Sequence, residues 1–250
     1  MHNRIINSLR YNIPKDTSKS MTLILGAKCI DGVVLMADKK VILNDGIDID
    51  YRDKLFAILD YVVFGSSGST DNFELFRGYA MEYFREHQVS FDDIVKELSG
   101  LAFRVNQKYD FSKDFYFDIL VALQYADRPS TLTFISGYGN PRTIEKYHML
   151  GSGASYGKVF LEKLWSEDLT MEQFAKLGYF IIKYVEDFRL NQAVGIGYDH
   201  PQIWFIPDGY SERSRDYQLT GATQFDMFRN NAVKMLKKHE AQLKTLSKKI

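Results

Sequence analysis

The sequence predicts an α+β fold, in which strands and helices occupy separate stretches of the chain. Apolar β-forming segments and amphipathic helical segments come in blocks, in the order strands, two helices, strands, two helices and strands. An Asp31-Gly32 pair lies between two apolar runs, and Asp-Gly in that setting is the strongest short-range signal for an antiparallel hairpin. Segregated blocks with hairpins favour layered α+β packing over a doubly wound parallel sheet.

The composition is that of a folded protein without a net charge. The 250 residues are 45% hydrophobic and 14% aromatic, and 32 basic residues balance 32 acidic ones. A neutral chain has no overall field to attract nucleic acid or a membrane, and no apolar stretch reaches the roughly 18 residues of a membrane span. A single cysteine, Cys29, excludes a disulfide framework and suits a reducing compartment. We therefore expect a cytoplasmic protein that binds neither nucleic acid nor membrane.

The chain is expected to have three parts. Residues 1–21 are mostly polar and lack a secretory apolar core, so they are a leader, a removable propeptide or an extension ahead of the true start. Residues 22–210 form the folded domain. Residues 211–250 form a C-terminal tail, basic and helical from about residue 221, with its charges facing solvent.

The first half of the domain is expected to contain two strand pairs and two helices. Thr22 opens and Asp38 closes the Asp-Gly hairpin, so these residues should lie near each other at one end of a sheet. Residues 44–53 are acidic, but their spacing does not match an EF-hand calcium loop, and a solvated loop is predicted. The remaining elements are strands at 54–59 and 61–64, a glycine turn at 65–68, and helices at 71–87 and 90–109.

The second half returns to strands and then to helices. Thr170 and Gln173 form a capping-box pattern that opens a helix to about residue 188. The other predicted elements are strands at 115–125, 132–136 and 146–150, a turn at 151–157 into a helix ending near Trp165, and strands at 193–198 and 202–206.

Two patterns in residues 151–157 suggest chemistry that their surroundings do not support. Gly151-x-Gly153 is similar to a dinucleotide-binding loop, but another helix follows where a βαβ unit needs a strand. Ser155 lies in a Gly-x-Ser-x-Gly nucleophile elbow, with Asp187 and then His200 or His239 as the partners it would need. The preceding strands look like hairpins and not like the parallel sheet that an elbow requires, so a serine hydrolase is kept only as an alternative.

No metal site or cofactor is predicted. The histidines show neither His-x-x-x-His spacing nor pairing with cysteine, and they are His2, His87, His148, His200 and His239.

The opening hairpin resembles the start of mature proteasome β-type subunits. The resemblance rests on the spacing of Thr22, Gly26, Asp31-Gly32 and Asp38, and on Lys54, which lies 32 residues after Thr22 (54 − 22) where that family keeps its active-site lysine. It spans about residues 22–206.

Later segments extend this resemblance and also show divergence. Phe64 to Asp71 resembles the family's glycine turn into its first helix, and Gly151-Ser152-Gly153 with Leu169-Thr170 resembles its second half. The segment from Lys54 to Gly65 is short, as in the bacterial HslV branch. Where the family keeps an Asp and then a Ser before Gly, this chain has Asn191 and Val194 before Gly195.

The resemblance implies an N-terminal-nucleophile hydrolase with a four-layer αββα sandwich. Thr22 would be the nucleophile after removal of residues 1–21, with its own α-amine, of pKa about 8, as the base. Lys54 would favour the free amine and the developing alkoxide, and Asp38 would hold Lys54 as an ammonium. The further implied roles are a proton network with Ser152, an oxyanion donor in the Gly65 backbone N–H, and a primary substrate pocket with Val63.

Two routes could expose Thr22. Active members of the resembled family are cut between Gly and Thr, whereas Ser20-Met21 precede Thr22 here. We expect that Met21 is the true initiator, whose removal before a small residue would leave Thr22 free.

The resemblance therefore implies a threonine-type peptide hydrolase in a homo-oligomeric ring, with an α-type ring or an ATPase as candidate partners. Two alternatives stay open. The chain could be a non-catalytic scaffold subunit, or a transpeptidase or ligase that uses the same threonine.

Overall fold

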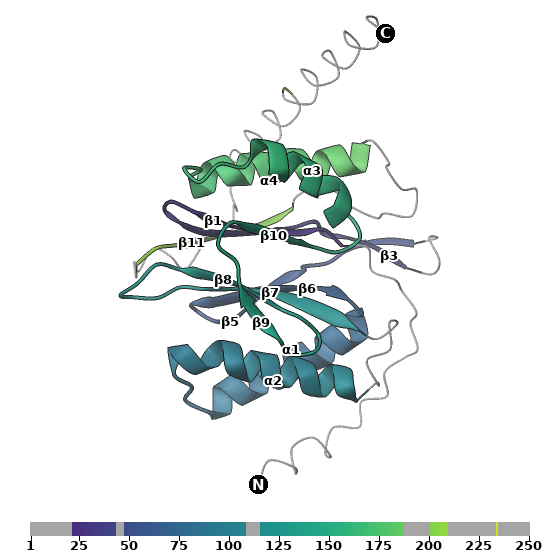
Figure 1. Cartoon of the computed structure of the whole chain (residues 1–250). Helices are drawn as coiled ribbons and strands as arrows, with labels where there is room; N and C mark the ends of the chain where they lie inside the picture. Colours follow the sequence, from purple (N-terminus) through teal and green to yellow (C-terminus); the bar gives the residue numbers. More distant parts are fainter. Residues whose placement is uncertain (1–21, 44–47, 109–115, 188–200, 210–233, 235–250) are drawn as a thin grey trace, which may run out of the picture.

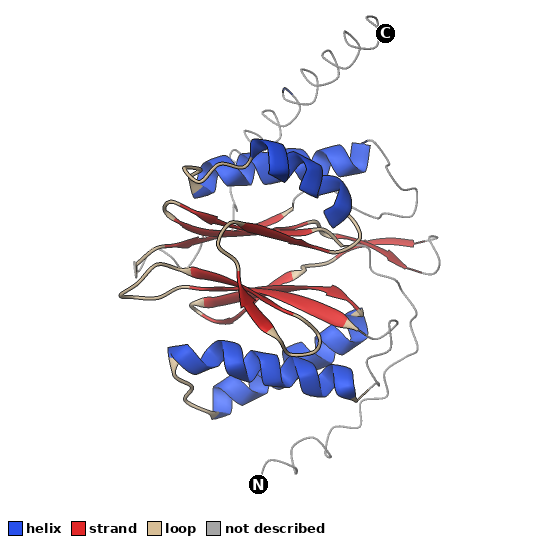
Figure 2. Cartoon of the chain, in the orientation of Figure 1, coloured by secondary structure: helices blue, strands red, loops and turns tan. Residues whose placement is uncertain are grey.

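Two antiparallel sheets lie face to face between two pairs of helices, as Figures 1 and 2 show. This arrangement is that of a computed structural model, which describes residues 22–43, 48–108, 116–187, 201–209 and 234. The predicted four-layer αββα sandwich is confirmed.

The first sheet has the strand order β10-β1-β2-β11, and each neighbouring pair is antiparallel. Its strands are β1 (Ile24–Cys29), β2 (Gly32–Ala37), β10 (Tyr147–Leu150) and β11 (Gln202–Pro207). Its outer face is covered by α3 (Ala154–Leu164) and α4 (Met171–Asp187). The sheet therefore joins the beginning of the domain to its end.

The second sheet has the order β5-β6-β7-β8-β9, again antiparallel throughout. Its strands are β5 (Leu55–Leu59), β6 (Val62–Gly68), β7 (Phe117–Leu123), β8 (Thr131–Ile135) and β9 (Pro141–Thr143). Its outer face is covered by α1 (Thr70–Glu86) and by α2 (Ile94–Gln107), which follows the short 3-10 turn η2 (Phe91–Asp93). A separate two-stranded ribbon consists of β3 (Lys40–Leu43) and β4 (Asp48–Tyr51).

Three apolar clusters fill the spaces between the four layers. Successive residues of a strand point to opposite faces, so Ile24 and Leu35 pack between the sheets while Leu25 and Met36 pack under α3 and α4. Burial on both faces explains why β1 and β2 read as nearly uninterrupted apolar runs.

The β1–β2 hairpin turns one residue earlier than predicted. Cys29 pairs with Gly32, so Ile30 and Asp31 are the two turn residues and Gly32 begins β2. Gly32 has a φ of 147°, and a Cβ there would overlap the Ile206 carbonyl oxygen of β11. This glycine is therefore required by the close approach of a neighbouring strand.

The other elements agree with the sequence except at three places, the first of which is β3, a strand at Lys40–Leu43 that was not predicted. Residues 48–51 form β4 within the predicted solvated loop, because their main chain pairs with β3. Strand β9 was not predicted, since its three exposed residues show no apolar alternation. The capping box is confirmed: Thr170 N donates to Gln173 Oε1 at 2.8 Å, and Gln173 N donates to Thr170 Oγ1 at 3.2 Å.

Some predictions fall outside the described residues. They are the leader at 1–21, the strand at 193–198, and the tail at 211–250 apart from residue 234. Among the helices that the structure describes, none is both long and apolar enough to cross a membrane.

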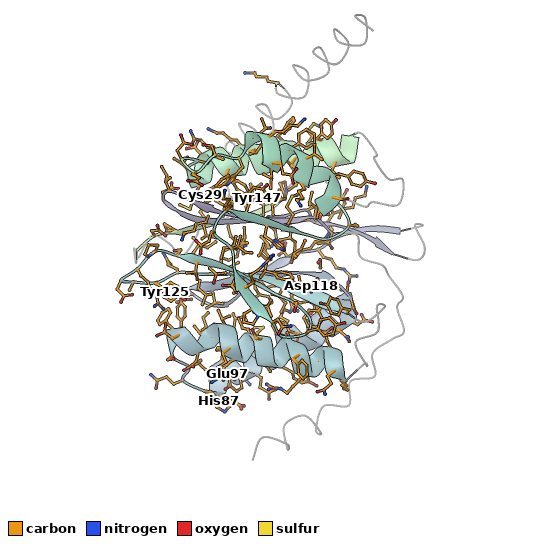
Figure 3. All side chains as sticks on the ribbon, in the orientation of Figure 1. Cys29, His87, Glu97, Asp118, Tyr125 and Tyr147 are labelled. Carbon is orange, nitrogen blue, oxygen red and sulfur yellow. The ribbon has the colours of Figure 1, made fainter. Side chains whose placement is uncertain are left out.

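Cys29 lies at the end of β1, under the helices of the first sheet (Figure 3). Burial raises the pKa of its thiol to about 12, and the charge of Asp31 acts in the same direction. A thiol with that pKa stays protonated at neutral pH, so Cys29 is not a candidate nucleophile.

Candidate active site

Three predicted site residues meet where β1 begins, β2 ends and β5 begins. The hairpin register places Asp38 opposite Leu23: Asp38 N donates to Leu23 O at 3.2 Å, and Leu23 N donates to Asp38 Oδ1 at 2.8 Å. The other carboxylate oxygen, Asp38 Oδ2, lies 2.8 Å from Lys54 Nζ. Thr22 and Lys54 line the same cavity. Only 3% of Thr22, 0% of Asp38 and 7% of Lys54 are exposed, so the group is almost fully enclosed.

Burial decides the electrostatics of Lys54. It lowers the pKa of the side chain below the ordinary value of 10.5, and the neighbouring Asp38 acts in the opposite direction. Lys54 Nζ also donates to the Lys40 carbonyl oxygen at 2.8 Å, which holds the side chain in place. An ammonium disfavoured by burial gives up its proton more readily than an exposed lysine, so Lys54 suits a site where protons are exchanged.

The glycine turn after β10 lies against the main chain of Thr22. Gly151 has a φ of 96°, and a Cβ there would overlap the Thr22 carbonyl oxygen. Gly153 N donates to the same oxygen at 3.4 Å, and Ser152 lies between the two glycines with its side chain exposed. Only glycine combines that φ with so close an approach.

Gly151→Ala is expected to lower the free energy of unfolding by roughly 1–3 kcal/mol, because alanine is strained at positive φ and its methyl group meets the Thr22 carbonyl. Urea unfolding followed by circular dichroism measures the change. Gly78→Ala is the matched control: nothing lies within 4 Å of a Cβ there, and alanine in mid-helix should be neutral or stabilising. A Gly151→Ala variant as stable as the wild type would contradict this account of the turn.

A cavity of about 430 Å³ lies beside Thr22, a size typical of sites that hold a small ligand or a side chain. Phe56 and Phe73 form an aromatic part of its wall. The Arg77 guanidinium carbon lies 4.5 Å from the centre of the Phe56 ring, and Arg77 pairs with Glu74 at 2.6 Å. This wall therefore combines an apolar surface with a positioned charge pair.

Strand β6 ends at the cavity, and its pairing shows which N–H groups face it. Ser69 N donates to Tyr116 O at 2.9 Å, so odd-numbered residues of β6 turn their N–H groups toward β7. The Gly65 N–H therefore faces its partner Leu120. The N–H of Gly68 points to the opposite edge, beyond the start of β5, and Gly68 lines the cavity.

Two other predicted residues lie away from this cavity. Val63 is buried between the two sheets. Ser155 is exposed on the first turn of α3, after a strand, β10, that is antiparallel to β1. The parallel sheet of a nucleophile elbow is therefore not built around Ser155.

Within the described ranges, no group of three or more His, Cys, Asp and Glu side chains could hold a metal ion. His87 is exposed and stacks on Tyr83, and His148 packs against Phe134. The discussed positions that lie outside the described residues are His2, Ser20, Met21, Asn191, Val194, Gly195, His200 and His239.

Gln202 was not among the predicted site residues, although its side-chain amide contacts the main chain of Lys54. One signal could have identified it. It is the single polar residue of a strand that is otherwise apolar up to Ile206, and a buried amide needs partners.

A model of the proteasome subunit family matches residues 19–193, which is more than half of the chain. The chain belongs to the proteasome subunit family. The sandwich described above is accordingly the proteasome-like N-terminal-nucleophile fold.

Relatives within the proteasome family are distant and include both subunit types. Proteasome subunit beta 1 of Pyrobaculum calidifontis is 29% identical over 65% of this chain and 81% of its own length. Proteasome subunit alpha of Methanococcus maripaludis is 26% identical over 67% of this chain and 66% of its own. Among solved structures, Anbu (ancestral beta-subunit) from Yersinia bercovieri has a TM-score of 0.70 at 19% identity, covering 88% of this chain and 97% of that one. An Anbu (Gly-1) mutant from Hyphomicrobium has a TM-score of 0.67 at 16% identity, covering 92% and 97%.

Proposed function

We propose that this protein is a threonine-type peptide hydrolase whose nucleophile is Thr22 Oγ. The observation that carries the proposal is the ion pair of Lys54 and Asp38, 2.8 Å apart and buried at the wall of a cavity that Thr22 also lines. A buried ion pair is a poor source of stability compared with apolar packing, so its place beside a hydroxyl and a cavity favours a chemical role.

In the proposed reaction, Thr22 Oγ attacks the carbonyl carbon of a peptide bond. The free α-amine of Thr22 accepts the hydroxyl proton through a water and then passes it to the leaving amine. The positive charge of Lys54 favours the unprotonated α-amine and the developing alkoxide, while Asp38 keeps Lys54 in position. Water then hydrolyses the acyl-threonine ester and regenerates the hydroxyl.

We propose the Gly68 N–H as the donor to the oxyanion, in place of the Gly65 N–H expected from the sequence. The β6–β7 ladder supports this choice, because it occupies the Gly65 side of the strand and leaves the Gly68 N–H directed to the cavity edge. One such donor contributes about 3 kcal/mol to transition-state stabilisation. Ser152 is proposed to contact the α-amine from the glycine turn.

The proposed substrate is a peptide or an unfolded protein, with one side chain against Phe56, Phe73 and Arg77 in the cavity, in place of the Val63 pocket expected from the sequence. We also propose that the protein works in the cytoplasm as a homo-oligomeric ring, with an α-type ring or an ATPase as candidate partners. Family membership supports the ring, and a single buried cysteine suits a reducing compartment.

The proposal requires Thr22 to be the first residue, which intact-mass measurement of native protein, purified from the cells that make it, tests directly. The expected mass lacks residues 1–21. A parallel sample expressed from Met21 onward should give the same mass, because methionine is removed before threonine. A mass that retains residues 1–21 would leave Thr22 without a free amine and favour a non-catalytic scaffold subunit.

A further inference from the structure

The side-chain amide of Gln202 forms three hydrogen bonds with the main chain at the start of β5. Its Oε1 accepts from Lys54 N at 2.5 Å and from Leu55 N at 2.9 Å, and its Nε2 donates to Leu55 O at 3.1 Å. Only 5% of Gln202 is exposed. The amide thus pairs with Leu55 as a neighbouring strand would, using one acceptor and one donor.

These contacts join the two sheets at the end where the candidate site lies. Gln202 is the first residue of β11 and pairs with Ala37 of β2, the residue before Asp38. Strand β5 is the edge of the second sheet, so none of the described strands lies on its outer side to bond with Leu55. The Gln202 side chain fills that place. Because Gln202 pairs with Ala37, it links the main chain of Lys54 to the end of β2, which Asp38 directly follows.

We propose that Gln202 is a positioning residue, which holds the Lys54 main chain at the distance from β2 that lets Lys54 Nζ reach Asp38 beside Thr22. This inference rests on the proposed function for its catalytic consequence, although the placement of Lys54 can be measured without turnover. Gln202 does not line the cavity itself, and its amide contacts only the main chain of Lys54 and Leu55, so it acts through Lys54.

A second buried glutamine, Gln124, serves as the control for Gln202, because it links the same two sheets away from the candidate site. Gln124 is equally buried, at 4% exposed, and its Nε2 donates to Pro207 O at 3.1 Å and to Gly209 O at 2.9 Å. It therefore ties the opposite end of β11 to the second sheet, after β7, and these two hydrogen bonds reach neither Lys54 nor Asp38.

The experiment compares Gln202→Met with Gln124→Met. Methionine keeps the length of the side chain and removes the amide, so both variants should lose stability. Only Gln202→Met is expected to lower kcat for a fluorogenic peptide, by about 10- to 100-fold, with KM nearly unchanged, because it displaces a group that acts in the transition state.

The second readout is the Lys54 titration, followed by NMR in protein labelled with 13C-lysine and assigned with a Lys54→Arg variant. Burial lowers the pKa of Lys54 in the wild type, so a side chain released from this position should titrate closer to 10.5. We expect this upward shift in Gln202→Met and no shift in Gln124→Met. If Gln202→Met does not fold, Gln202→Asn and Gln124→Asn replace the pair, since one methylene less prevents all three contacts.

Equal kcat and equal Lys54 titration in the two methionine variants would overturn the positioning role. The proposed function fails separately: if the wild type shows no turnover that depends on Thr22, the hydrolase proposal is lost, yet the Lys54 titration still decides whether Gln202 positions that side chain.

Discussion

Thr22→Ala is expected to abolish peptide hydrolysis, lowering kcat by at least about 10³-fold, because it removes the oxygen that attacks the carbonyl. A fluorogenic peptide library measures the turnover. A peptide epoxyketone gives an independent readout, since its stable adduct requires both a hydroxyl and a free amine on one N-terminal residue. The wild type should gain one adduct mass and Thr22→Ala none.

Thr22→Ser is the control for this substitution, because it keeps the hydroxyl and the amine and removes one buried methyl group. It should form the adduct and retain measurable turnover. Equal turnover in the wild type and Thr22→Ala would instead favour a scaffold subunit. Products formed with an added amine acceptor distinguish hydrolysis from transpeptidation, since both pass through the same acyl-threonine.

Asp38→Asn is expected to have the second largest effect, with a loss of roughly 3–5 kcal/mol in the free energy of unfolding, together with most of the activity. Asparagine keeps the shape of the side chain and an oxygen for the Leu23 N–H, but it leaves the buried Lys54 ammonium without its counter-charge. Urea unfolding at neutral pH measures the stability, with the peptide assay run on the same samples.

A double variant provides the control. Replacing both charges, in Asp38→Asn with Lys54→Met, should recover much of the stability lost in Asp38→Asn and none of the activity. A single Asp38→Asn variant as stable as the wild type would mean that the ion pair does not hold this end of the sheets together.

The same pair makes stability depend on pH. Because burial lowers the pKa of Lys54 in the folded state below 10.5, the unfolded chain binds more protons at Lys54 between the two pKa values. The contribution of Lys54 to the free energy of unfolding therefore rises with pH across that interval, and Lys54→Met should remove this rise.

The sequence predicted that Thr22 and Asp38 lie close together, because the spacing of two residues in a hairpin determines whether they face each other. A two-residue turn between strands of equal length brings Leu23, just before β1, opposite Asp38, just after β2, whatever the side chains are. Thr22 precedes Leu23, so Thr22 and Asp38 could be placed near each other from the sequence. Lys54 required the family resemblance, since no local rule says where the residue before β5 will pack.

The parts that the sequence did not predict depend on contacts between distant segments. Gly32 was assigned to the turn because Asp-Gly is a local signal. Its need for glycine comes instead from the close approach of β11, which lies more than 150 residues later in the sequence. Gln202 and Leu55 are likewise 147 residues apart. The proposal of the Gly68 N–H in place of the Gly65 N–H also rests on the pairing of β6 with β7, which becomes visible only when both strands are in place.

The packing of the core between the sheets also determines the distance between Asp38 and Lys54. Asp38 belongs to one sheet and Lys54 to the other, and the space between them is filled by side chains such as Ile24, Leu35 and Leu120. A substitution in that layer that lets one sheet slide against the other alters the Lys54–Asp38 distance without touching either residue. Substitutions in the interior alone can therefore abolish the proposed activity, while Thr22, Asp38 and Lys54 all remain in the sequence.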